Sequence, residues 1–232
     1  WDLWAPVGRL ERRYTWNEAR EFILGQFASF SGPLEALARR AYDHHWLDAE
    51  PRDGKRGGAF CMRVIGVEES RVLCNFDGSL DQVSTIAHEL GHAYHNETQK
   101  GKTPLQRRTP MTLAETASIM NETIVTDAAL AQAADAEEEL AILETFLLNS
   151  SQVIVDIYSR YLFETEVFQR REAAELSADD FCEMMSRAQK ETYAEALDPQ
   201  HLHPYMWTWK PHYYIPSLSF YNFPYAFGLL FG

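Results

Sequence analysis

The residues best suited to chemistry in this sequence form the segment His88-Glu89-Leu90-Gly91-His92. On a helix, side chains at positions i and i+4 lie on one face, so both imidazoles can reach one metal ion while the glutamate projects beside it. This donor set is typical of a catalytic zinc site, in which the metal raises the acidity of a water molecule. We therefore expect His88 and His92 to bind one Zn²⁺ per chain and Glu89 to accept the proton of that water.

A third metal ligand is expected from the segment Leu113–Ser118, which places Glu115 among small side chains 23 positions after His92. Catalytic zinc sites use three protein ligands and leave a fourth position open. A helix packed across the first one would bring this carboxylate to the ion. Glu122, two helical turns further on, either orients a ligand histidine through its free ring nitrogen or is a solvated helix charge. His95 lies too far along the first helix to share a tetrahedral site, so we do not expect it to be a ligand.

Helical patterns surround these residues along most of the chain. Capping signatures at Thr15 and Ser79 mark two helix starts, the second of which opens the helix with the two histidines. Two short strands are predicted over residues 59–67 and 71–76, joined by a turn at 68–70. Apolar spacing predicts helices over residues 16–31, 33–47, 80–96, 111–132, 136–171 and 178–195, and another that begins near Ser219. We therefore expect a mainly α fold: a zincin-like helical catalytic domain with a small β-hairpin or sheet beside the active-site helix.

Length and composition limit the other interpretations. The chain has 232 residues, 46% of them hydrophobic, which is enough to bury a core. We expect a single catalytic domain over 1–232, with a helical lead-in to about residue 50, a loop and hairpin over 51–79, and a helical metal-site core over 80–232. The net charge of −13 argues against nucleic-acid and anionic-membrane partners. Apolar runs far shorter than about 20 residues argue against a membrane span.

The three cysteines are widely spaced and form no C-x-x-C pattern, which favours a reducing compartment. The chain starts at Trp1 without an initiating Met or a signal sequence, and it stops at Gly232 just after an apolar run. Both ends suggest a fragment of a longer protein.

Several segments resemble the thimet oligopeptidase-like metallopeptidases, most closely the bacterial oligoendopeptidase F branch. The resemblance implies the catalytic, C-terminal portion of a longer and mostly helical protein with a channel that admits short peptides. The missing N-terminal portion would form the opposing wall. The matching segments share the family's order and span most of the chain: Gly58-Ala-Phe-Cys61, Asn75-Phe-Asp-Gly-Ser79, Ile86–His95, Leu113–Ser118 and the tyrosine-rich tail from Trp209 to Gly228.

The same resemblance implies where a peptide substrate lies. The glycine-rich loop with Gly58 and Phe60 would lie against the bound peptide. The hairpin that ends in residues 71–76 would offer a strand edge to the peptide, an instance of β-strand addition.

A late cluster of histidine and tyrosine is also implied by the resemblance. Its members would stabilise the oxyanion that forms when water attacks the scissile carbonyl, which is a task for preorganised donors. His212 corresponds to the histidine, and we assign Tyr221 to the oxyanion and Tyr225 to substrate binding. The tail is about two residues longer than is usual in the family, so Tyr213 and Tyr214 remain alternatives.

These expectations describe a cytoplasmic zinc metalloendopeptidase that hydrolyses short oligopeptides with metal-activated water. Two alternatives remain open. The chain could be a fragment that binds metal or peptide without turnover, or another zinc hydrolase with the same ligand set, such as a carboxypeptidase or an amidase. Glu89 argues against the first alternative, because a structural zinc site uses four protein ligands and needs no general base.

Overall fold

The computed structural model describes residues 12–232, and residues 1–11 of the expected helical lead-in lie outside the described residues. The fold is mainly helical with a small sheet, as predicted, and this sheet has three strands where the sequence predicted two. Of the described residues, 12–146 and 227–232 form a first compact unit, and 147–226 form a second. The expectation of a single catalytic domain stays a prediction.

The first unit begins with two helices, α1 (Trp16–Phe30) and α2 (Gly32–Asp43). The predicted capping box of α1 is present: the Thr15 hydroxyl accepts from the Glu18 amide, and the Glu18 carboxylate accepts from the Thr15 amide. Helix α2 ends four residues earlier than predicted. The reason is that His45 adopts a left-handed conformation with φ of 56°, after which the chain joins the sheet.

The sheet has the order β1-β3-β2 and consists of β1 (Leu47–Asp48), β2 (Phe60–Val64) and β3 (Glu69–Leu73). Strands β2 and β3 are antiparallel, as expected for a hairpin, whereas β1 pairs with β3 in parallel. Within the hairpin, β3 lies between two neighbours, so the expected peptide-binding edge is limited to β2 and stays a prediction. Among the described residues, the two edges of the sheet belong to β1 and β2.

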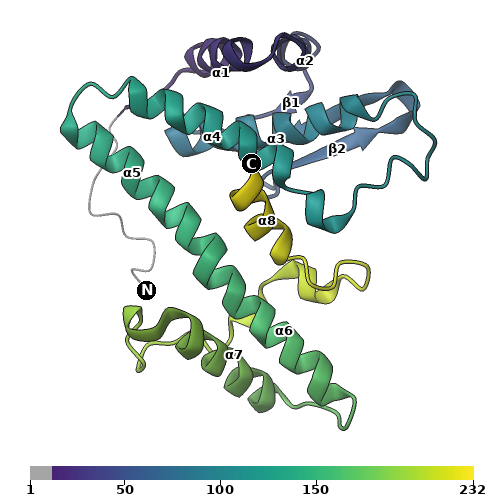
Figure 1. Ribbon diagram of the computed structural model, residues 1–232, viewed down its shortest axis with the longest axis vertical. Coiled ribbons are helices and arrows are strands. Elements are labelled where there is room, and N and C mark those ends of the chain that lie inside the picture. The colour runs from purple at the N-terminus through teal and green to yellow at the C-terminus, as the bar shows by residue number, and fades with distance from the viewer. Residues whose placement is uncertain (1–11) are drawn as a thin grey trace. The chain divides into compact units, whose positions relative to one another are not determined.

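Helix α3 (Leu80–Thr98) begins at the predicted Ser79 cap and packs against the sheet, α1 and α4 (Figure 1). The helix predicted over 111–132 is interrupted: a 3₁₀ turn at Met111–Leu113 precedes α4 (Thr116–Ala131). Glu115 is consequently the N-cap residue of α4 and does not lie in a helix interior.

A continuous helical run was predicted over 136–171, and the structure contains it. It comprises α5 (Ala136–Ser151), a π-helical turn (Gln152–Asp156) and α6 (Ile157–Arg171). By length and composition alone this run is long and apolar enough to cross a bilayer, a test that core helices of soluble proteins also pass. The prediction that the protein has no membrane partner is thus left as a prediction.

In the second unit, α7 (Ala178–Tyr193) packs along α6 (Figure 1). The chain then follows 3₁₀ turns at Ala194–Ala196, Met206–Thr208 and Pro211–Tyr214. The last helix, α8 (Phe223–Phe231), starts in this unit and ends with residues of the first. It begins four residues later than predicted, because Phe220 adopts a left-handed conformation with φ of 60°. Buried side chains of this unit form their own apolar cluster: Phe163, Met184, Met185, Ala188 and Met206.

The capping box of α1 provides a test of local stability. We expect Thr15→Ala to lower the free energy of unfolding by about 1 kcal/mol, because the Glu18 amide loses its acceptor. Thr15→Ser keeps the hydroxyl and is the matched control, expected to stay within about 0.5 kcal/mol of the unaltered protein. Urea titration followed by circular dichroism measures both, and equal stability of the two variants would contradict the role of the cap.

Candidate metal centre

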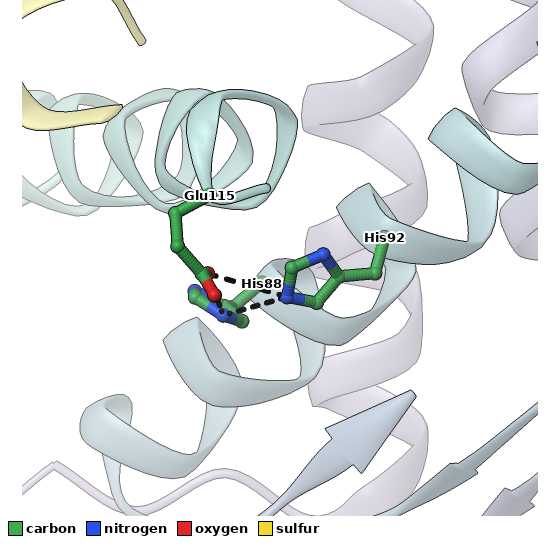
Figure 2. A group of neighbouring side chains, drawn as sticks. All are labelled: His88, His92 and Glu115. Atoms are coloured by element: carbon green, nitrogen blue, oxygen red, sulfur yellow. Dashed lines mark hydrogen bonds and ion pairs between the residues drawn. The ribbon is translucent and has the colours of Figure 1, made fainter. Parts of the chain in front are cut away.

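Three side chains from two helices converge in the first unit (Figure 2). His88 and His92 project from one face of α3, and Glu115 reaches them from the start of α4. The Nε2 atoms of His88 and His92 are 3.2 Å apart. Glu115 Oε2 lies 3.2 Å from His88 Nε2 and 3.3 Å from His92 Nε2. The three donors thus form a nearly equilateral triangle.

The size of this triangle fits a tetrahedral zinc ion. Zinc binds histidine nitrogen and carboxylate oxygen at about 2.0–2.1 Å, which gives tetrahedron edges of about 3.3–3.4 Å between ligand atoms. The observed edges of 3.2–3.3 Å match this value. Three protein donors leave a fourth corner for water or substrate, as in catalytic sites.

Gly91 allows α3 and α4 to approach closely enough for this geometry. A Cβ atom at this position would lie 2.6 Å from the carbonyl oxygen of Ala117 and 2.7 Å from both Ser118 Cα and Asn121 Nδ2. Side chains essentially never approach backbone atoms so closely. The glycine between the two histidines is therefore a packing requirement for bringing Glu115 to them.

Two hydrogen bonds orient the ligands. His88 Nδ1 is hydrogen-bonded to Glu122 Oε1, which directs Nε2 toward the other donors. Glu122 was expected either to orient a ligand histidine or to be a solvated charge, and this hydrogen bond to His88 supports the first role. The buried Ser118 hydroxyl donates to Glu115 Oε2 at 2.9 Å, a contact that sequence reasoning missed. A hydroxyl three residues after an acidic residue at a helix start is the signal that could have indicated it.

The electrostatics of the site favour a positive charge between the carboxylates. Burial of the His88 ring opposes its protonation, yet hydrogen bonds to Glu115 and Glu122 outweigh burial and raise its pKa to about 10. Burial likewise opposes ionisation of Glu115, but His88 and His92 hold its pKa well below the usual value. A divalent cation held by the same donors meets this demand for positive charge.

Glu89 lies beside the triangle and has the environment of a proton carrier. Its side chain is buried, and in the described part of the chain Oε2 has no hydrogen-bond partner. Burial raises the pKa of this carboxyl, and the neighbouring histidines only partly offset that effect. A raised carboxyl pKa suits a group that takes up and releases a proton near neutral pH.

Residues outside the triangle are engaged elsewhere. His95 Nε2 accepts a hydrogen bond from Gln99 at 3.1 Å, consistent with the expectation that it is not a ligand. Gly58 adopts a φ of 78°, and its carbonyl accepts from Asn75 at 3.0 Å, which anchors the glycine-rich loop. Phe60 starts the edge strand β2 and is exposed.

The late histidine and tyrosines lie in the second unit. In the described structure, His212 Nε2 is buried and has no hydrogen-bond partner. Burial and the nearby charges of Arg160 and Lys210 lower the His212 pKa to about 4, so the ring is neutral at pH 7. The rings of Tyr221 and Tyr225 pack edge to face at 5.7 Å. The proposed roles of all three residues stay predictions.

The two alternative tyrosines, Tyr213 and Tyr214, are hydrogen-bonded to backbone carbonyls of the second unit. The Tyr213 hydroxyl donates to Arg160 O at 3.5 Å, and the Tyr214 hydroxyl donates to Trp207 O at 3.1 Å. Burial also raises the pKa of Tyr213.

Two histidines and a buried glutamate on one helix, with a carboxylate from a crossing helix, form the side-chain arrangement of metal-dependent hydrolases. The chain belongs to peptidase family M3, whose sequence profile matches residues 34–229. The resemblance drawn from the sequence is thereby confirmed.

Individual relatives agree with this family. The chain is 28% identical to the chromosomal oligoendopeptidase F of Lactococcus lactis subsp. cremoris over 98% of its own length and 38% of the relative's. It is 26% identical to the group B oligopeptidase PepB of Streptococcus agalactiae, with the same shares of the two chains. The solved structure of PZ peptidase A with an inhibitor superposes with a TM-score of 0.75 at 17% identity, over 97% of this chain and 38% of that one. At this identity the likeness shows the fold alone.

Gly91 provides a test of the metal centre that leaves every ligand in place. We expect Gly91→Ala to weaken zinc binding by at least about tenfold, because the added methyl group pushes α4 and Glu115 away from the histidines. Gly25→Ala, in α1 with open space around its Cβ, is the matched control and should leave zinc affinity unchanged. Competition with a chromophoric chelator measures both, and equal affinities would refute the steric argument.

Proposed function

We propose that this chain is the catalytic portion of a zinc-dependent endopeptidase that hydrolyses short oligopeptides. The observation that carries the proposal is the triangle of donors from His88, His92 and Glu115, sized for zinc and flanked by the buried Glu89. Membership of a peptidase family and the names of the oligopeptidase relatives support the same reaction class.

The reaction assigns distinct tasks to the protein side chains. Zinc, when bound by the three ligands, supplies a Lewis acid that polarises the scissile carbonyl and lowers the pKa of water. Glu89 takes the proton of the attacking water and passes it to the leaving amine. Its raised pKa supports both halves of this task, because the protonated form must persist long enough to donate.

Residues of the second unit would stabilise the charge that develops on the carbonyl oxygen. Neutral His212 and the Tyr221 hydroxyl donate hydrogen bonds to the oxyanion in this proposal. Gly58, Phe60 and Tyr225 contact the peptide, and its backbone pairs with the free edge of β2.

The chain spans about 38% of the length of the curated relatives it matches. We therefore propose that a further N-terminal portion of the same protein completes the wall of the substrate channel. Short peptides are the proposed partners, nucleic acid and membranes are not, and the cytoplasm is the proposed location. The three cysteines are free, in keeping with a reducing compartment.

Glu89→Gln separates metal binding from turnover. We expect one zinc per chain in both proteins, with kcat at least about 1000-fold lower in the variant because the general base is lost. Mass spectrometry gives the metal content, and hydrolysis of a quenched fluorescent peptide gives the rate. Glu97→Gln, on the same helix but in a surface ion pair with Arg40, is the control and should keep full activity. No stoichiometric zinc in the unaltered protein would refute the metal centre.

Peptides with blocked ends distinguish an endopeptidase from a carboxypeptidase with the same ligands. We expect a peptide that is acetylated and amidated at its ends to be cleaved internally at a rate within about threefold of the free-ended peptide, since main-chain pairing with β2 needs neither terminus. Mass spectrometry of the products identifies the cleaved bond. Cleavage only of peptides with a free carboxylate would favour the carboxypeptidase.

A further inference from the structure

A buried carboxylate from α6 holds the turn that carries Tyr221. Glu164 is 5% exposed, and each of its carboxylate oxygens accepts a hydrogen bond from this turn. The Phe220 amide donates to Oε1 at 2.7 Å, and Asn222 Nδ2 donates to Oε2 at 3.0 Å. One carboxylate thus holds the residues on both sides of Tyr221.

Phe220 needs this support because its backbone is strained. Its φ of 60° lies in the left-handed region, which is unfavourable for a bulky side chain. The ring of Phe220 stacks on Phe168 with centroids 5.3 Å apart and lies 5.9 Å from the Tyr161 ring. Helix α6 therefore holds Phe220 through its ring as well as through its amide.

The backbone around Tyr221 is fixed residue by residue. The Tyr221 amide donates to Leu218 O at 3.3 Å. The Asn222 amide donates to Phe220 O at 2.8 Å, which closes a three-residue turn centred on Tyr221. The Phe223 amide donates to Asn222 Oδ1 at 2.6 Å at the start of α8. These hydrogen bonds fix the backbone position from which the Tyr221 side chain projects.

A buried carboxylate is unfavourable unless hydrogen bonds offset its desolvation. Burial raises the pKa of Glu164, and the hydrogen bond from Phe220 acts in the opposite direction. Both hydrogen bonds described above come from the Tyr221 turn, so the stability of the ionised carboxylate and the shape of the turn depend on each other.

We propose that Glu164 is a positioning residue of the peptidase reaction, which acts through Phe220 and Asn222 to hold the Tyr221 hydroxyl where the oxyanion develops. This inference rests on the proposed function, in which Tyr221 donates to that oxygen. Oxyanion donors work because they are preorganised, and a displacement of about 1 Å costs on the order of 100-fold in rate. Glu164 touches no reacting atom in this role, so its loss lowers kcat and leaves KM nearly unchanged.

Reversing the direction of one hydrogen bond tests the proposal. Glu164→Gln places a second NH₂ group opposite that of Asn222, so two donors face each other. Asn222→Asp places a second carboxylate opposite that of Glu164, so two acceptors face each other. The double variant Glu164→Gln/Asn222→Asp restores one donor and one acceptor with the same net charge. We expect kcat for peptide cleavage to fall about 10- to 100-fold in each single variant. In the double variant it should return to within about threefold of the unaltered protein, with zinc content constant throughout.

A second comparison identifies the route of the effect. We expect Tyr221→Phe to lower kcat by about 100-fold, because the donor hydroxyl is lost. Adding Glu164→Gln to Tyr221→Phe should cause no further loss, since Glu164 acts through that hydroxyl. Glu172→Gln, at the exposed end of α6, is the control and should match the unaltered protein.

The outcomes separate this inference from the proposed function. Unchanged kcat in Glu164→Gln, losses that add to those of Tyr221→Phe, or a failure of the double variant to recover would each overturn the positioning role. In all three cases zinc-dependent cleavage by the unaltered protein would leave the proposed function standing. Unchanged kcat in Tyr221→Phe would instead refute the tyrosine's part in the reaction and the inference with it.

Discussion

The metal centre depends on the close crossing of α3 and α4 at Gly91. Without a side chain there, the start of α4 lies against the histidine helix, and one carboxylate oxygen reaches both imidazoles at 3.2–3.3 Å. Buried polar side chains of α4 then complete the arrangement, since Ser118 bonds to the Glu115 carboxylate. Gly228, in the same unit, also allows close packing against α4. A Cβ atom at this position would lie 2.6 Å from Ile119 Cδ1 and 2.9 Å from the Glu115 carbonyl oxygen. Two glycines, Gly91 and Gly228, thus allow the close packing that holds Glu115 in place.

The parts of the fold that were predictable are those specified by local sequence. Helices α1, α3 and α7 have clear caps and apolar stripes, so their starts matched the predictions closely. The two histidines and their helix are among these predictable parts, because a spacing of four residues places both side chains on one face of the helix. Glu115 was chosen for its small neighbours and the open third position, and the structure brings it to the histidines.

The remaining features depend on contacts between distant residues, which one sequence does not reveal. Strand β1 has two residues, too few for any period, and exists because it pairs with β3. That pairing leaves only β2 of the hairpin with a free edge, which the sequence did not reveal. Glu164 looked like any polar helix residue, since its partners lie 56 and 58 positions away. The left-handed conformation at position 220 could not be predicted, because the residue there is phenylalanine and not glycine or asparagine.

The π-helical turn at Gln152–Asp156 affects how the helix formed by α5 and α6 tolerates a change in length. An α-helix advances by about 100° per residue, and a π turn accommodates roughly one extra residue. Because the turn takes up the extra residue locally, losing a single residue there would let it close as ordinary α-helix and leave the side chains of α6 on their present faces. A residue lost from within α6 has no such turn to absorb it, and its loss would rotate the residues beyond it by about 100° relative to those before it.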